Sequence, residues 1–256
     1  MELKDKVIAI TGGASGLGEA STRHFVTQGA KVMILDINDD NAKAICDELG
    51  DESVKYVNTN IMEEEPVKDA MSKIEEAFGK LHVAINCAGT GYGARIIGKD
   101  APHPLDHFKF IIDLNLVGTF NVMRLAAELM DKNEADEDGE KGVIINTASI
   151  AGYEGQIGQA AYSASKGGVV GMTLPIARDL SVAGIRVLTI APGTFDTPML
   201  GMLPEEIRQA IANGIPFPKL LGDPAQYAHL VEHMVQNSYM NGETVRLDGA
   251  LRLAPK

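Results

Sequence analysis

The sequence predicts an α/β fold built as one doubly wound parallel sheet with helices on both faces. Short apolar runs alternate with longer segments in which apolar residues recur at helical spacing. The turn between the first predicted strand and the first predicted helix is rich in glycine. No composition break or linker divides the chain, so we expect residues 1–256 to form a single domain.

The predicted strands are short apolar runs bounded by turns, as buried parallel strands are. They cover residues 7–10, 32–35, 54–57, 83–85, 143–145, 185–190 and 244–247. The predicted helices cover residues 15–28, 41–49, 67–78, 105–130, 162–180, 204–212 and 224–235. Pro175 removes one hydrogen bond inside its helix and predicts a local kink. The long connections are a loop over 90–105, an acidic loop over 131–142, and a mobile flap over 194–221.

The composition of the chain excludes several classes of function. Basic residues number 23 against 35 acidic ones, a net charge of −12, which argues against broad binding to nucleic acid or to an anionic membrane. Two cysteines, Cys46 and Cys87, imply no disulfide framework. No apolar run approaches the roughly 18 residues that span a bilayer. Met1 lies a few residues before the first strand, so we expect no targeting peptide and a soluble intracellular protein, cytoplasmic if it is bacterial.

Residues 11–18 read T-G-G-A-S-G-L-G. Glycines permit a tight turn and close approach of the backbone to a phosphate, and the helix that follows offers free N–H groups to a pyrophosphate. Such a turn alone is weak evidence, but here it joins a strand to a helix, and Asp36 ends the second strand. We therefore expect a Rossmann-like dinucleotide site. Its expected contacts in the turn are Gly12, Ser15, Gly16, Leu17 and Gly18.

Asp36 favours NAD over NADP. A carboxylate at this position accepts hydrogen bonds from the adenosine ribose and repels a 2′-phosphate. The next residue is Ile37, not an arginine that could pair with that phosphate.

Tyr162 and Lys166 stand four residues apart on a predicted helix and so share one of its faces. A nearby ammonium favours the charged form of a phenol and lowers its pKa. The pair could therefore supply a general base near neutral pH. The spacing also occurs by chance on solvated helix faces, so its meaning depends on the surrounding motifs.

Those motifs resemble the signature set of the short-chain dehydrogenase/reductase family. They occur in the family's order and cover almost the whole chain: T-G-x-x-x-G-x-G at 11–18, N-C-A-G at 86–89, Asn115, Ser149, Tyr162 with Lys166, and P-G at 192–193. The resemblance implies one Rossmann-like domain, usually in a homotetramer, that moves hydride between a nicotinamide and a carbonyl or alcohol.

The resemblance also implies roles for single residues. Tyr162 would be the catalytic base, and Lys166 would lower its pKa and hold the nicotinamide ribose. Ser149 would hydrogen-bond the substrate oxygen, and Asn115, at a helix irregularity, would support a water leading protons to Lys166. Taken singly, Ser149 could be a helix cap, Asn115 a satisfied buried amide and Lys166 a surface cation; together these plain readings are disfavoured.

Further cofactor contacts follow from the same resemblance, with two departures. Many members have asparagine where Cys87 stands, and we interpret Cys87 as structural, not nucleophilic. Relatives often have aspartate where Asn60 stands, and its side-chain carbonyl can still accept from the adenine amino group. The full set of these further contacts is Asn60, Ile61, Cys87, Gly89, Phe195 and Thr197.

Within the family, residues 142–149, 155–166, 171–179 and 222–229 resemble the branch that oxidises short-chain and 2-methyl-branched 3-hydroxyacyl-CoA esters with NAD. A dehydrogenase of steroids or other secondary alcohols is the alternative, and a binding or scaffold subunit a more distant one. For an acyl-CoA substrate, Arg95 and Lys99 in the 90–105 loop could flank the CoA phosphates. Solvated loop charges are an equally good interpretation of that pair.

Two further patterns predict no site. Residues 229–233 read H-L-V-E-H, which fits a metalloprotease motif, but no third ligand region follows and an apolar-faced surface helix explains them better. Residues 163–166 fit S-x-x-K without the motifs that accompany it in penicillin-binding enzymes. We expect no metal site.

Overall fold

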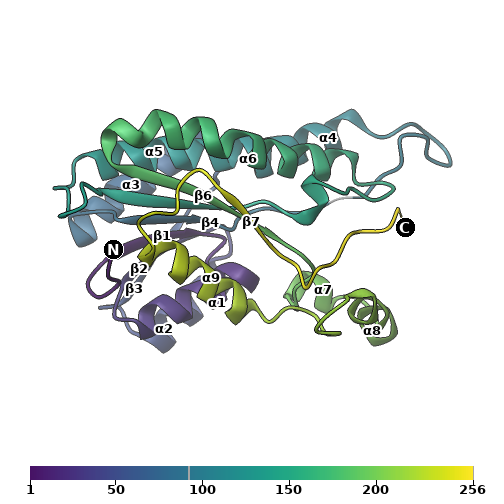
Figure 1. The fold of residues 1–256 in the computed structure, drawn as a ribbon, viewed down its shortest axis with the longest axis horizontal. Helices are drawn as coiled ribbons and strands as arrows, with labels where there is room; N and C mark the ends of the chain where they lie inside the picture. Colours follow the sequence, from purple (N-terminus) through teal and green to yellow (C-terminus); the bar gives the residue numbers. More distant parts are fainter. Residues whose placement is uncertain (92, 256) are drawn as a thin grey trace.

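A computed structural model describes residues 1–91 and 93–255, and its centre is a seven-stranded sheet in the order β3-β2-β1-β4-β5-β6-β7 (Figure 1). Every neighbouring pair of strands is parallel. The predicted α/β class with a doubly wound parallel sheet is therefore confirmed.

The strands match the predicted apolar runs to within about two residues at either end. Their bounds are β1 Val7–Thr11, β2 Lys31–Asp36, β3 Val54–Asn58, β4 Val83–Asn86, β5 Gly142–Thr147, β6 Ile185–Pro192 and β7 Thr244–Leu247.

The longer helices lie where the helical spacing predicts them. Their bounds are α1 Gly16–Thr27, α2 Asp39–Leu49, α3 Glu64–Phe78, α4 Leu105–Ile112, α5 Thr119–Asp131, α6 Ala160–Asp179 and α9 Pro224–Gln236. A π-helical segment, η1 Asp113–Gly118, joins α4 to α5. Short 3₁₀ turns follow β5 at η2 Ile150–Gly152 and α6 at η3 Leu180–Ala183.

The order of the strands in the sheet indicates where a ligand site lies. β1 pairs with β2 on one side and with β4 on the other. From β1 the chain first builds outward to β3, then returns past β1 and builds the other half from β4 to β7. Such a reversal leaves a crevice at the carboxyl ends of the strands, where ligands of open α/β sheets bind.

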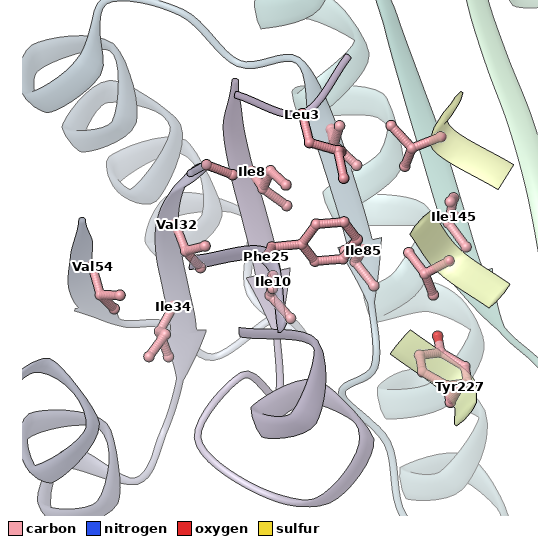
Figure 2. Close-up of a cluster of buried hydrophobic side chains, with 14 of the residues drawn as sticks. Leu3, Ile8, Ile10, Phe25, Val32, Ile34, Val54, Ile85, Ile145 and Tyr227 are labelled. Carbon is pink, nitrogen blue, oxygen red and sulfur yellow. The ribbon is translucent and has the colours of Figure 1, made fainter. Parts of the chain in front are cut away.

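Alternation along the strands builds two cores, one on each face of the sheet. Ile8 and Ile10 of β1 face the core shared with α1 and α9, whereas Val7 and Ala9 face the core shared with α3, α5 and α6. Figure 2 shows the first core, where Phe25 reaches the centre of the sheet beside Ile10 and Ile85. Figure 1 shows the two helical layers on opposite sides of the sheet.

One helical stretch, Leu105–Asp131, is apolar and long enough to cross a membrane by length and composition, contrary to the expectation that no such run exists. Its most apolar window has a mean hydropathy of 1.3 and is 56% buried inside the protein. A core helix of a soluble protein passes the same test, because its apolar side faces the sheet.

Two other segments differ from the prediction or refine it. The predicted flap over 194–221 contains two helices, α7 Pro198–Gly201 and α8 Glu205–Gly214, where one was expected. Helix α6 continues through Pro175 without a break. The kink at that residue stays a prediction.

Candidate active site

The glycine-rich turn packs too tightly for side chains at two positions. Gly12 has a left-handed φ of +64°, and a Cβ there would lie 2.9 Å from the backbone nitrogen of Ala88. A Cβ at Gly18 would lie 2.1 Å from the carbonyl oxygen of Gly12, so only glycine lets α1 start this close to β1. The result is a bare backbone surface beside the N-terminus of α1, as a pyrophosphate requires.

Asp36 stands next to this turn. Its Oδ2 accepts a hydrogen bond from the backbone N–H of Ala14 at 3.0 Å, and its Oδ1 accepts from that of Asn38 at 3.0 Å. The two N–H groups orient the carboxylate and leave one lone pair on each oxygen for a further donor. The exposed Ile37 side chain beside it carries no charge.

Asn60 and Ile61 follow β3 and are fixed by local contacts. The side-chain carbonyl of Asn60 accepts from the Met62 backbone N–H at 3.2 Å, and Ile61 is buried. Asn121 of α5 donates to the Ile61 carbonyl at 3.0 Å. The carbonyl of Asn60 therefore already caps a turn, and only its second lone pair remains for an adenine.

Cys87 lies in a buried polar cluster behind the turn. The Thr147 hydroxyl is 2.7 Å from the Tyr227 hydroxyl and 3.6 Å from the Cys87 sulfur. Burial raises the pKa of Cys87, which keeps it a thiol and agrees with a structural role.

Ser149 caps η2 and also contacts Tyr162. Its Oγ accepts from the Ala151 backbone N–H at 3.1 Å, and its hydroxyl hydrogen-bonds the phenol of Tyr162, which lowers the pKa of that phenol. The serine is thus a cap and a partner of the tyrosine at once. The Ala151 N–H polarises the serine hydroxyl in the direction that favours a phenolate.

Burial has the larger effect and raises the pKa of Tyr162 above its usual value. The Lys166 ammonium lies over the ring, with Nζ 5.9 Å from the ring centroid, and its lowering of the phenol pKa stays a prediction. Proton abstraction at neutral pH therefore needs further positive charge beside the phenol.

Lys166 is a buried cation, not a surface one. Its Nζ donates to the Thr147 carbonyl at 2.8 Å, and burial lowers its pKa to about 8. An ammonium has three donors, so two remain for ligands such as ribose hydroxyls. This partly satisfied buried donor is the clearest feature in the site that calls for a polar ligand.

Asn115 is fully buried inside the π-helical segment, so the structure has a helix irregularity where one was expected. Its amide exchanges two hydrogen bonds of 2.9 Å with the backbone of Thr90 and donates to the Ser165 hydroxyl at 3.1 Å. The side chain is satisfied and holds the loop after β4. Its proposed support of a water stays a proposal.

The loop after β4 leaves room above the pair. A Cβ at Gly89 would lie 2.9 Å from Asn115 Oδ1 and 3.4 Å from Lys166 Nζ, and one at Gly91 would lie 3.9 Å from the Tyr162 ring. Glycines at these positions keep a side chain out of the space beside the lysine and the tyrosine.

The start of the flap completes the site. Phe195 is buried and forms a short parallel bridge with Gly222. Thr197 lies against the turn, since a Cβ at Gly16 would sit 3.5 Å from its methyl group. The predicted cofactor contacts at the turn and in the flap thus face each other.

The structure brings together Ser149, Tyr162, Lys166 and Asn115 from three separate segments. Sequence reasoning missed Thr147 and Thr90, which act through their backbone carbonyls and so leave no side-chain signal. Arg95 and Lys99 are both exposed. Their contact with the CoA phosphates stays a proposal.

Comparison with known families gives a match over most of the chain. The pattern of the family described as short chain dehydrogenase matches residues 6–208. That range includes the glycine-rich turn, Ser149, Tyr162 and Lys166.

Curated relatives match over almost the full length. The chain is 51% identical over 255 residues to 3-hydroxyacyl-CoA dehydrogenase type-2 of Bos taurus, covering 99% of this chain and 97% of that protein. It is 50% identical to the Drosophila melanogaster protein of the same name, covering 99% and 100%. The crystal structure of 3-hydroxyacyl-CoA dehydrogenase type-2 from Mycobacterium avium superposes with a TM-score of 0.94 at 45% identity, covering 100% of this chain and 98% of that one.

Proposed function

The chain belongs to the short chain dehydrogenase family, and we propose that it oxidises short-chain or 2-methyl-branched 3-hydroxyacyl-CoA esters to 3-oxoacyl-CoA with NAD, reversibly. The observation that carries the substrate class is identity of about half over the whole length to relatives named for that reaction. The contacts among Ser149, Tyr162 and Lys166 supply the chemistry that such a reaction needs.

The residues present fit a nicotinamide dinucleotide. The bare turn at Gly12 and Gly18 would take the pyrophosphate, and the free donors of Lys166 would take ribose hydroxyls. Asn60, Ile61, Cys87, Gly89, Phe195 and Thr197 stay proposed contacts. When bound, the nicotinamide supplies the hydride acceptor.

We propose NAD over NADP because of Asp36. Its carboxylate is held beside the turn by two backbone N–H groups and has lone pairs free for ribose hydroxyls. The fixed negative charge would repel a 2′-phosphate.

The proton of the substrate alcohol would go to Tyr162. Ser149 contacts the phenol and would hold the substrate oxygen beside it. Lys166 stays protonated at neutral pH with its pKa of about 8, so it places a positive charge in the buried space near the phenol. A cation there offsets the effect of burial on the pKa of Tyr162.

We also propose a homotetramer that acts in the cytoplasm. Support for assembly comes from the stretch Leu105–Asp131, where Phe110 and Val117 are each 47% exposed and Phe120 is 48% exposed. Exposed aromatic and apolar side chains on one helical stretch favour burial against another subunit.

A substrate panel tests the proposal. The purified protein is assayed with 3-hydroxyacyl-CoA esters of increasing chain length, with a 2-methyl-branched ester and with steroid alcohols, each with NAD and NADP. We expect turnover of the short-chain esters with NAD. If the protein binds NADH but turns over no hydroxyacyl-CoA, the substrate assignment is wrong.

Tyr162→Phe supplies the mechanistic control. Removing the proton acceptor should lower kcat by about 10²- to 10⁴-fold while NADH binding persists. Tyr239→Phe is the matched control, because Tyr239 is 99% exposed and its substitution should change neither.

A further inference from the structure

Helices α1 and α9 pack side by side on one face of the sheet and bring three possible metal ligands together (Figure 1). They are His24 of α1 with His229 and Glu232 of α9, and their ligand atoms all lie within 4.8 Å of one another. His24 Nε2 is 2.7 Å from Glu232 Oε2, and the ring centroids of His24 and His229 are 5.0 Å apart. The cluster draws on residues more than 200 positions apart, so only the fold assembles it.

The spacing within α9 suits a shared ligand. His229 and Glu232 are three residues apart, which places both side chains on the same face of the helix. That face looks toward His24 at the last turn of α1. His229 is exposed while His24 and Glu232 are partly buried, so solvent can reach the cluster from one side.

The carboxylate has a supporting contact. Gln236 Nε2 donates to Glu232 Oε1 at 3.3 Å, which leaves Oε2 directed at His24. Second partners of this kind orient metal-binding carboxylates and tune their affinity.

We propose that His24, His229 and Glu232 form a binding site for Zn²⁺ or a similar first-row transition metal. Two imidazoles and one carboxylate are a known zinc ligand set, with a water as the fourth ligand. The ligand atoms here are separated by between 2.7 Å and at most 4.8 Å, a range that includes the roughly 3.3 Å between ligand atoms around tetrahedral zinc. Side-chain movements alone can therefore close the site.

The bound metal would cross-link α1 and α9. His24 lies at the end of α1 opposite the glycine-rich turn, so the metal would stabilise the fold without entering the reaction. The site also differs from the metalloprotease reading of residues 229–233. That motif uses His229 with His233, whereas the third ligand here comes from α1, and the exposed His233 is not among the clustered residues.

Metal titration of the tag-free protein tests the site. In calorimetry with Zn²⁺ we expect one equivalent bound to the wild type, and with Co²⁺ the absorption of a four-coordinate site. His24→Gln, His229→Gln and Glu232→Gln should each lose that equivalent. Gln236→Ala should keep the stoichiometry and weaken binding by about tenfold.

His233→Gln is the matched control and should bind as the wild type does. Zn²⁺ should also raise the melting temperature of the wild type and of His233→Gln but not that of His229→Gln, an exposed substitution that should not disturb folding. The proposal is overturned if the wild type binds no metal, if His229→Gln keeps the equivalent, or if His233→Gln loses as much affinity as His229→Gln.

Discussion

Asp36 is the residue on which the choice of cofactor should depend. Asp36→Ser removes the charge-assisted contact to the ribose, worth about 1.5–3 kcal/mol, so affinity for NAD should fall by about 10- to 100-fold. Affinity for NADP should rise, and more so when Ile37→Arg is added. Cofactor titrations measure both effects.

Asp40→Ser is the control for Asp36. It removes the same charge four residues later, from an exposed position in the first turn of α2. If both substitutions change the preference equally, the carboxylate of Asp36 has no specific role.

At the scale of single residues, the sequence predicted which side chains lie close together, but not their pKa shifts or their hydrogen-bond partners. Tyr162 and Lys166 lie close, as their spacing predicts, yet burial dominates the pKa of the tyrosine. A periodic pattern places side chains on a face, whereas desolvation depends on the strands and loops that cover that face. Ser149 similarly proved to be both a helix cap and a partner of the phenol, which its position alone could not tell apart.

Among the elements, the π-helical segment holds the loop after β4 through one side chain. Asn115→Leu would leave the Thr90 backbone N–H and carbonyl without their partner and cost about 1–3 kcal/mol of unfolding free energy. The loosened loop covers Lys166, so KM for the cofactor should rise as well. Urea unfolding and steady-state kinetics measure the two effects.

Asn121→Leu, in the helix α5 that follows the π-helical segment, separates the effect on stability from the effect on function. Asn121 is also buried and donates to the backbone, but to Ile61 and Glu63. It should cost similar stability and raise KM less. An equal rise for both variants would show that Asn115 has no special link to the site.

The starts of β1 and β4 are joined by His82, whose Nδ1 accepts from the Val7 backbone N–H at 3.0 Å. Burial lowers the pKa of His82 to about 4 from 6.5. Protons therefore bind the unfolded chain first as the pH falls, and stability is lost between about pH 6.5 and pH 4. Lowering the pH from 7 to 5 should lower the free energy of unfolding by about 1 kcal/mol, less than the full shift would give, because His82 is only partly buried and solvent screens its charge.

His82→Asn removes the titrating group and should flatten this part of the pH profile. Urea midpoints at pH 7 and pH 5 give the comparison. A wild type and a variant that lose the same stability over this range would contradict the assignment.

Most elements were predictable because apolar periodicity is local. The strand Thr244–Leu247 was predicted at the residues it occupies, and α9 ends one residue beyond its predicted end. The π segment and the short α7 have no comparable periodic signal. They depend on contacts with distant segments, such as that of Thr197 with the glycine-rich turn.

A buried ion pair between Arg186 and Glu140 joins β6 to the loop before β5. Arg186 donates to Glu140 at 2.8 Å and to the carbonyls of Met234 and Val235 near the end of α9. Arg186→Met would leave the buried Glu140 charge with only the more distant Met1 ammonium, 3.9 Å from Oε2, which should lower the free energy of unfolding by up to about 3–5 kcal/mol. Urea unfolding measures the loss.

Adding Glu140→Leu to Arg186→Met should restore part of that stability, because the buried carboxylate that lost its guanidinium partner is then gone. Lys68→Met is the comparison at the surface, where the pair with Glu64 is exposed and screened by solvent, so its loss should change stability far less. A double variant as unstable as the sum of its single changes would contradict the pairing.

Long-range assembly was the part the sequence could not predict. Residues 140 and 186 bear charges that look like ordinary surface charges in the sequence, and His24 gives no sign that it meets α9. The fold class follows from repeated local patterns, whereas these contacts depend on how the patterns stack.

The strand order also has a consequence during synthesis. The strands from β4 to β7 are added in chain order on one side of β1. Each of them can therefore pair with the strand beside it, which is already synthesised, as soon as it leaves the ribosome. The Gln156 side chain, however, donates to the carbonyl of Ala254, and the backbone of Ile157 donates to that of Pro255. The loop between Ser149 and Tyr162 is therefore held by hydrogen bonds to residues that are translated about 100 positions later. A nascent chain can complete its sheet before this loop takes its final form.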